Sequence, residues 1–269
     1  IRVCFDNGMI KELARYLVEK MDLDLWGRVL NKEADEEETP SRRSLIEQVV
    51  QTALPESKNP DEVSTTVKAF MTADLPHELI ELLERIVLQG SDFSNNRNLQ
   101  NLLILTAIKA VPERVMDYIQ RLDNFDGPDI AKIASSEQYE LFEEAFVIYD
   151  KFKNYSEAID VLLQSLDNIE RGREYALRVD TADVWSRVGR AQLEALMVEE
   201  AIASFIKADD PEQFVEVIRI AEDSALFEPL INYLQMSRKK VKERRIDTEL
   251  IYAYARTNML AELEEFIAS

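Results

Sequence analysis

Glycine is scarce in this chain, with six residues among 269, or about 2% against a usual share of roughly 7%. Sheets, barrels and phosphate-binding loops depend on glycine for tight turns and close backbone approach, whereas pairs of helices need far less of it. The eight prolines stand where helices are expected to begin, in the clearest cases just after a capping side chain. Those cases are Asn59-Pro60, Asp74-Leu75-Pro76 and Asp210-Pro211. The composition therefore predicts an all-α protein.

Histidine and cysteine, the residues most used for catalysis and metal binding, occur once each. Cys4 has no partner for an internal disulfide, which fits a reducing compartment. His77 opens a segment like a zinc-protease helix, but Glu81 stands where the second histidine must be. The glycine-rich phosphate motifs are absent, and Asp22-Leu23-Asp24 lacks the further oxygen ligands of a calcium loop. The sequence thus predicts no catalytic, cofactor-binding or metal-binding residues and no cofactor.

Positive charge is also in deficit, because 32 lysines and arginines face 52 aspartates and glutamates, a net charge of −20. Such a surface repels phosphate backbones and anionic bilayers. The longest apolar stretch, Leu102–Ile108, is much too short to cross a membrane. We therefore expect no nucleic-acid partner and no direct membrane insertion.

One stretch reverses the prevailing charge, with six cations in eight residues. They are Arg238, Lys239, Lys240, Lys242, Arg244 and Arg245. Runs of charge are usually solvated helix faces, which is the first interpretation. A docking patch for an acidic partner, or for an acidic part of a neighbouring copy, is the second, and a nuclear-import address is a less favoured third. The sequence leaves these interpretations open.

A weak internal repeat organises the chain. Its pattern, clearest in Leu141–Tyr149, has apolar residues at the first, eighth and ninth places and a small or apolar residue at the fifth. Copies start at positions 9, 75, 111, 141, 168, 197, 226 and 259, and Leu45–Val50 lies where the copy missing from the first interval should be. Apolar spacing of this kind is one stripe of a helix, and a unit of about 30 residues holds two helices of ordinary length.

Such units favour a stack, because one helical pair cannot bury both of its apolar faces without neighbours. The fold class we predict is an all-α, α–α superhelix, an α-solenoid of short helical hairpins of about 30 residues each. Residues 1–269 would form one continuous array, divided roughly into repeat blocks 1–130 and 131–269. An ordinary helical bundle is the alternative. The acidic stretch from Lys32 to Arg43 and the connection Leu54–Pro60 interrupt the pattern.

Several long stretches resemble the leg of the clathrin heavy chain, nearly end to end and in order. They are Arg43–Leu54, Val67–Pro76, Asn98–Ala110, Arg114–Ile119, Arg121–Phe125, Ile206–Pro211 and Ala261–Ile267. The resemblance implies an α-zigzag solenoid without enzymatic activity, on the cytosolic face of coated pits and coated vesicles. It implies a rigid leg segment that packs with other heavy-chain legs in a lattice serving endocytosis and intracellular protein transport.

The likeness is nearest to the distal leg, so the chain reads as a fragment of a longer one. It would lack the terminal propeller, the trimerisation region and most of the proximal leg, so light-chain contacts would lie mostly outside it. The acidic stretch around Glu33–Pro40 is longer than the family pattern, which puts lattice contacts near it in doubt.

Two classes of alternative remain. A tetratricopeptide adaptor needs tryptophan, glycine and tyrosine at fixed offsets, and neither Trp26 nor Trp185 stands in that context. A vacuolar-sorting scaffold shares related repeats, and only the long stretches above argue against it. An all-α enzyme with a site between helices is the other class, and the single histidine argues against it.

Overall fold

The computed structural model describes residues 3–4, 7–30 and 40–268, except for the side chains of residues 40–42. The acidic stretch Glu33–Glu38 lies outside these residues. The described residues contain seventeen α-helices and no strand, which confirms the all-α helical-repeat prediction. The first eight are α2 (Ile10–Lys20), α3 (Leu23–Leu30), α4 (Pro40–Gln48), α5 (Pro60–Thr72), α6 (Pro76–Leu88), α7 (Arg97–Ala110), α8 (Val115–Arg121) and α9 (Gly127–Ala134). The other nine are α10 (Phe142–Lys151), α11 (Tyr155–Asp160), α12 (Ile169–Val179), α13 (Ala182–Glu194), α14 (Val198–Ala208), α15 (Phe214–Asp223), α16 (Phe227–Lys240), α17 (Arg244–Arg256) and α18 (Leu260–Ala268).

Short non-α turns extend three of these helices. A π-helical turn, η2 (Val49–Ala53), follows α4, and another, η4 (Val161–Ser165), follows α11. A single 3-10 turn, η3 (Pro112–Arg114), leads into α8. Buried side chains of η2 and η4, such as Val50 and Leu162, keep these wider turns within the apolar interior.

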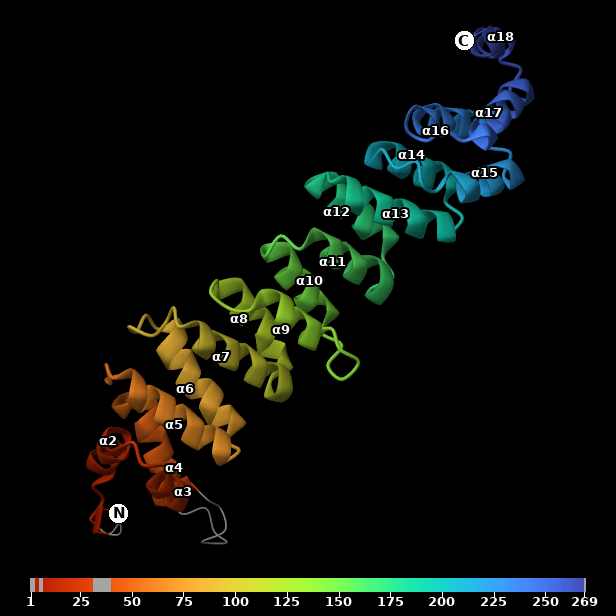
Figure 1. Ribbon diagram of the computed structural model, residues 1–269. Helices are drawn as coiled ribbons and strands as arrows, with labels where there is room; N and C mark the ends of the chain where they lie inside the picture. Colours follow the sequence, from red (N-terminus) through yellow and green to blue (C-terminus); the bar gives the residue numbers. More distant parts are fainter. Residues whose placement is uncertain (1–2, 5–6, 31–39, 269) are drawn as a thin grey trace. The chain divides into compact units, whose positions relative to one another are not determined.

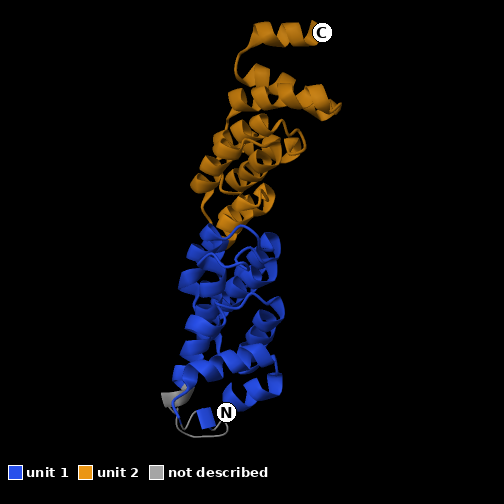
Figure 2. Ribbon diagram, turned by 90° about the vertical axis from the view of Figure 1, so that its left-hand side faces the viewer, with its two compact units in different colours: residues 1–144 blue, residues 145–269 orange. Residues whose placement is uncertain are grey.

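The chain forms two compact units, residues 1–144 and residues 145–269 (Figure 2). In the first, α6 packs on α5 and α7, while α3 packs on α5 and α7 on α9. In the second, α13 packs on α12 and α14, while α11 packs on α13 and α14 on α16. Within each unit, then, helices contact both the next helix and the one after it (Figure 1). This is the nearest-neighbour packing of a solenoid.

The sequence repeat marks alternate helices of these stacks. Each of the eight copies starts one residue before an even-numbered helix or, at 111, before the 3-10 turn leading into α8. The additional copy at Leu45–Val50 falls across the junction of α4 and η2. The apolar places of the pattern supply buried residues, as Ala201 and Phe205 of α14 show.

Left-handed residues close the turns that precede most of these helices. The residue before the repeat start has a φ between 47° and 60° at six non-glycine positions, namely Asp74, Glu140, Asp167, Leu196, Ala225 and Asn258. At several turns the next amide then donates to a carbonyl five residues earlier, as from Met197 to Gln192 (2.9 Å) and from Leu226 to Ala221 (2.9 Å). These are the bonds of a Schellman-type helix end, where glycine is the usual residue. The chain therefore needs the left-handed conformation that glycine favours, but mostly meets that need with other residues.

Leu196 offers a test of what this choice costs. Its φ is 60° and 72% of its surface is exposed, so it bears backbone strain without burying its side chain. We expect Leu196→Gly to raise the free energy of unfolding by about 0.5–1 kcal/mol, since glycine adopts this conformation without a Cβ clash. Urea denaturation would measure the change.

The control is Leu177→Gly, because Leu177 is also exposed but lies inside α12. That substitution should lower the free energy of unfolding by about 1 kcal/mol, the ordinary cost of glycine within a helix. A stability loss from Leu196→Gly as well would mean that the Leu196 side chain contributes more than the strain costs.

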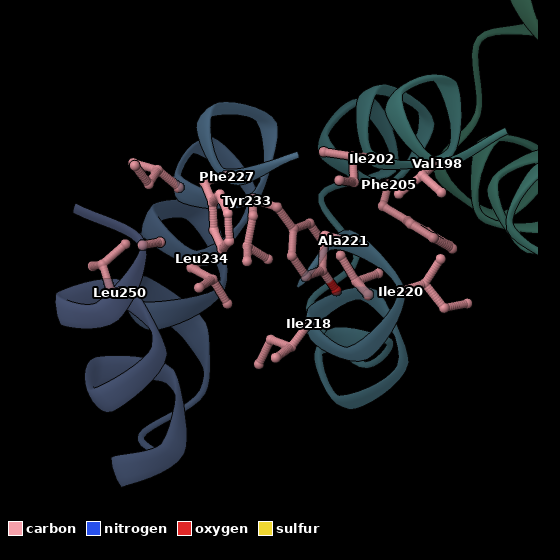
Figure 3. Packing of buried hydrophobic residues seen from close by; sticks show 14 of the residues in the cluster. Val198, Ile202, Phe205, Ile218, Ile220, Ala221, Phe227, Tyr233, Leu234 and Leu250 are labelled. Atoms are coloured by element: carbon pink, nitrogen blue, oxygen red, sulfur yellow. The ribbon is translucent and has the colours of Figure 1, made fainter. Parts of the chain in front are cut away.

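A continuous apolar cluster contributed by α13 to α17 forms one part of the core of the second unit. Phe205 of α14 and Tyr233 of α16 are fully buried, with ring centroids 6.2 Å apart (Figure 3). Gly189 of α13 lets that helix approach closely, because a Cβ at this position would lie 2.8 Å from the Phe205 ring. The main role of Gly189 is therefore to leave room for an aromatic ring.

Candidate functional site

Two features beyond the apolar core distinguish the described residues. One is a set of hydrogen bonds and ion pairs that connect successive even-numbered or odd-numbered helices, which we name the polar ladder. The other is the cation-rich turn between α16 and α17. The polar ladder holds neighbouring repeats together, and the cation-rich turn faces solvent.

The rungs of the polar ladder on even-numbered helices share one chemistry. In the first unit, Glu84 of α6 accepts from the Tyr118 hydroxyl of α8 and from Arg114 of η3, the latter at 3.2 Å. In the second unit, Asp150 of α10 accepts from the Tyr175 hydroxyl and from Arg178, both on α12 and both at 3.0 Å. One carboxylate thus accepts hydrogen bonds from a tyrosine of the next even-numbered helix and from an arginine of that helix or of the turn that leads into it.

A variant of this rung joins α14 to α16. The Tyr233 hydroxyl donates to the backbone carbonyl of Asp210 at 3.1 Å, and the Lys240 ammonium donates to the carbonyl of Asp209 at 3.1 Å and to its carboxylate. Tyrosine and a base again come from the later helix, while the acceptors are now at the end of the earlier one. The same donor chemistry therefore recurs at three repeats.

The odd-numbered helices carry rungs of their own. Arg187 of α13 donates to both carboxylate oxygens of Asp160 on α11, at 2.6 and 2.8 Å, and Ser156 of α11 donates to Asp183 of α13 at 2.5 Å. The hydrogen bonds from Ser156 and Arg187 hold the pKa of Asp183 below its ordinary value. Charge-assisted contacts of this kind are the stronger class of hydrogen bond.

The ladder tyrosines stay neutral at any physiological pH. Burial, and then the hydrogen bond to Glu84, raise the pKa of Tyr118 to about 12, while Arg114 opposes the shift. Burial and the bond to Asp150 likewise raise the pKa of Tyr175, and burial raises that of Tyr233. Each tyrosine hydroxyl therefore keeps its proton and remains a hydrogen-bond donor.

The structure brings the six cations of the sequence-predicted patch to a single turn. Arg238, Lys239 and Lys240 form the last turn of α16, Lys242 follows in the connection, and Arg244 and Arg245 open α17. All six side chains are exposed. The structure thus places them together, as expected of a surface feature.

Two of the six are used within the chain. Arg238 lies 2.9 Å from Asp247 and stacks over the Phe266 ring at 4.4 Å, while Lys240 forms the ladder rung to Asp209. Sequence reasoning missed both roles. The sequence contained one signal for the role of Lys240. Asp209 and Lys240 are an acid and a base 31 residues apart, which is about one repeat. The other four, Lys239, Lys242, Arg244 and Arg245, define what we call the cationic surface.

The cations of the two helices differ in their effect on helix stability. Basic side chains in the last turn of α16 complement the negative end of the helix dipole. Arg244 and Arg245 instead occupy the first turn of α17, where positive charge opposes the dipole by about 0.3–1 kcal/mol each. Helix stability therefore does not account for these two arginines.

A carboxyl pair lies beside the cationic surface. Burial, and then the hydrogen bond with Glu222, raise the pKa of Glu249 above its ordinary value, while Arg245 opposes the shift. The folded state therefore favours the protonated carboxyl. Its stabilising effect is present at low pH and is lost as the pH rises through the raised folded-state pKa.

We expect Glu249→Gln to raise the free energy of unfolding at pH 7, because glutamine has no proton to lose. The gain should shrink as the pH falls and be lost below about 4, the ordinary glutamate pKa, because wild type is then protonated in both states. Denaturation at several pH values would show this, with exposed Glu264→Gln as control. A gain that is independent of pH would contradict the electrostatic cause.

His77 lies exposed in the first turn of α6, at the edge of a groove of about 500 Å³ that Glu81, Glu113 and Arg114 also line. No group of three metal-ligating side chains is assembled anywhere in the part of the chain that the structure describes. None of the helices in that part is both long enough and apolar enough to cross a lipid bilayer.

The stacked helical pairs and their ladder define a class, the α-solenoids built from short helical repeats. A family model described as a region in clathrin and VPS matches residues 54–200 and 205–269. That match covers most of the chain and narrows the class to the clathrin and VPS repeats.

Whole-chain comparisons narrow the class further. The chain is 59% identical to clathrin heavy chain 1 of Arabidopsis thaliana over 267 residues, 99% of this chain and 15% of that protein. It is 56% identical to the clathrin heavy chain of Drosophila melanogaster and 54% identical to clathrin heavy chain 2 of Homo sapiens, covering 16% of each. The chain belongs to the clathrin heavy chain family, as the resemblance predicted, and the vacuolar-sorting alternative is not favoured. It spans about a sixth of the length of these relatives.

Proposed function

We propose that this chain is a structural leg segment of a clathrin coat, with no catalytic activity of its own. The observation that carries the proposal is a sequence identity of 54–59% to clathrin heavy chains over nearly the whole chain. The polar ladder supports a mechanical role, because it connects successive repeats at their surface while the apolar core connects them inside. In the complete protein the segment would pack with other heavy-chain legs at the cytosolic face of coated pits and vesicles.

Several finer points belong to the same proposal. The segment would lie in the distal leg, with most light-chain contacts elsewhere, and its repeats would divide near residue 130 into two blocks of the family type. The whole protein would serve endocytosis and intracellular transport through self-assembly. The net charge of −20 supports a role without nucleic acid or membrane insertion.

A chimeric heavy chain would test the coat role. The segment would replace its counterpart in the Drosophila melanogaster clathrin heavy chain, and assembly of the purified protein would be followed by sedimentation and electron microscopy. We expect closed cages like those of the unaltered heavy chain. A chimera that is folded by circular dichroism and still trimeric, yet forms no closed lattice, would contradict the proposal.

We also propose that the cationic surface docks an acidic segment of a protein partner. The supporting observation is the position of Arg244 and Arg245, which oppose the dipole of α17 and face solvent. Because these two arginines lower the stability of the helix on which they lie, a binding role fits them better than a structural one.

A further inference from the structure

We infer that the cationic surface binds the acidic segment Glu33–Glu38 of a second copy of this chain. The inference rests on the docking role proposed above and commits it to one occupant. It is carried by three observations: the exposed positive charge at the α16–α17 turn, the composition of the acidic segment, and the charge of the rest of the chain.

The positive charge available for binding is well defined. Arg238 and Lys240 have carboxylate partners within the second unit, at Asp247 and Asp209. Lys239, Lys242, Arg244 and Arg245 remain as exposed cations within seven consecutive residues, with Glu243 among them, and Arg245 also interacts with Glu249. Their spacing places several positive charges close together on one surface.

The acidic segment is the matching feature of the sequence. Residues 33–38 hold five carboxylates, at Glu33, Asp35, Glu36, Glu37 and Glu38, and no cation. Since the net charge of the chain is −20, most of its surface repels such a segment. The cationic surface lies in the stretch of the sequence where cations are concentrated. Complementary charges of this kind determine which partner binds and in which register it binds.

A contact between two copies suits these properties. Exposed ion pairs are individually weak and screened by salt, so several of them give a reversible contact. The surface and the segment are different parts of the chain, so each copy offers both halves of the contact. A lattice that must be dismantled needs contacts of this strength.

Sedimentation velocity of the whole chain tests the inference. At about 100 μM protein and 25 mM salt we expect a mass above the 31.0 kDa of one chain. Raising the salt to about 500 mM should weaken the association at least tenfold, because the Debye length falls below about 5 Å. Association that is insensitive to salt would overturn the inference.

Two variants, each with one half of the proposed contact neutralised, test the inference further. One carries glutamine at Lys239, Lys242, Arg244 and Arg245, and the other carries neutral amides at the five carboxylates of 33–38. Each alone should remain monomeric, while an equimolar mixture should associate again, because each supplies the half that the other lacks. Unfolding curves should show that neutralising Arg244 and Arg245 does not destabilise the fold.

The contrary results are equally definite. If the segment variant alone still associates, the occupant is another acidic region, and the inference is wrong. The remaining alternative is that the segment contacts the cationic surface of its own chain. Carbodiimide cross-linking of mixed isotope-labelled and unlabelled chains tests it, because links formed only within single chains would exclude a second copy as partner. Cage assembly by the chimera is scored separately, so failure here would leave the coat proposal standing.

Discussion

Replacing Phe205 with alanine should lower the free energy of unfolding of residues 145–269 by about 3–5 kcal/mol. The ring is fully buried on α14, contacts Tyr233 of α16, and lies where a Cβ on Gly189 of α13 would collide with it. Truncation therefore removes buried apolar surface and leaves a cavity shared by three helices. Urea denaturation followed by circular dichroism would measure the loss.

Leu177→Ala is the matched control, because Leu177 is an apolar side chain of the same unit that is 52% exposed. Its truncation should change stability by less than about 0.5 kcal/mol. A loss from Phe205→Ala no larger than the control's would mean that the α13–α14–α16 contact is not the centre of the unit. Adding Gly189→Ala to Phe205→Ala should cost less than Gly189→Ala alone, because the obstructing ring is gone.

Replacing Asp150 with alanine should destabilise the second unit by about 1–3 kcal/mol. The Tyr175 hydroxyl loses its acceptor while the Tyr175 side chain stays buried, and Arg178 loses its ion pair. The larger part of the cost comes from the unpaired hydroxyl. Hydrogen exchange should also report faster opening of α12, because the rung to α10 is lost.

Tyr175→Phe separates the two contributions. Alone it should cost about 1 kcal/mol, but in the Asp150→Ala background it should restore about 1 kcal/mol, because it removes the buried hydroxyl that has lost its acceptor. The control is Asp117→Ala, which breaks an exposed pair with Arg121 on one helix and should cost less than about 0.5 kcal/mol. Equal losses from Asp150→Ala and Asp117→Ala would contradict a special role for the ladder.

The sequence predicted the helical repeat well because the repeat depends on local, periodic information. Apolar places recur with helical spacing inside each copy, and all eight numbered copies, though not Leu45–Val50, begin one residue before a helix or its leading turn. The low glycine content indicated helices correctly. It did not reveal that residues such as Leu196 and Ala225 would adopt a left-handed conformation, because neither side chain favours it.

The polar ladder could not be predicted in the same way. Glu84 and Asp150 look like ordinary solvated residues of helix faces, and their partners lie 25 to 34 residues later. Which acid meets which base depends on how neighbouring helices are rotated, a property of packing. The cation-rich run was visible as composition, but the use of Arg238 and Lys240 within the chain depended on that same packing.

The short reach of the ladder has a consequence for synthesis on the ribosome. The rung from Asp150 to Tyr175 and Arg178 joins residues 25 and 28 positions apart, and that from Asp209 to Lys240 joins residues 31 apart. After one repeat has been synthesised, its hydrogen-bond partners leave the ribosome with about one further repeat. At 5–20 residues per second this takes roughly 2–6 seconds. Low contact order of this kind lets each repeat be completed in turn, so little apolar surface is exposed while a long chain is still being made.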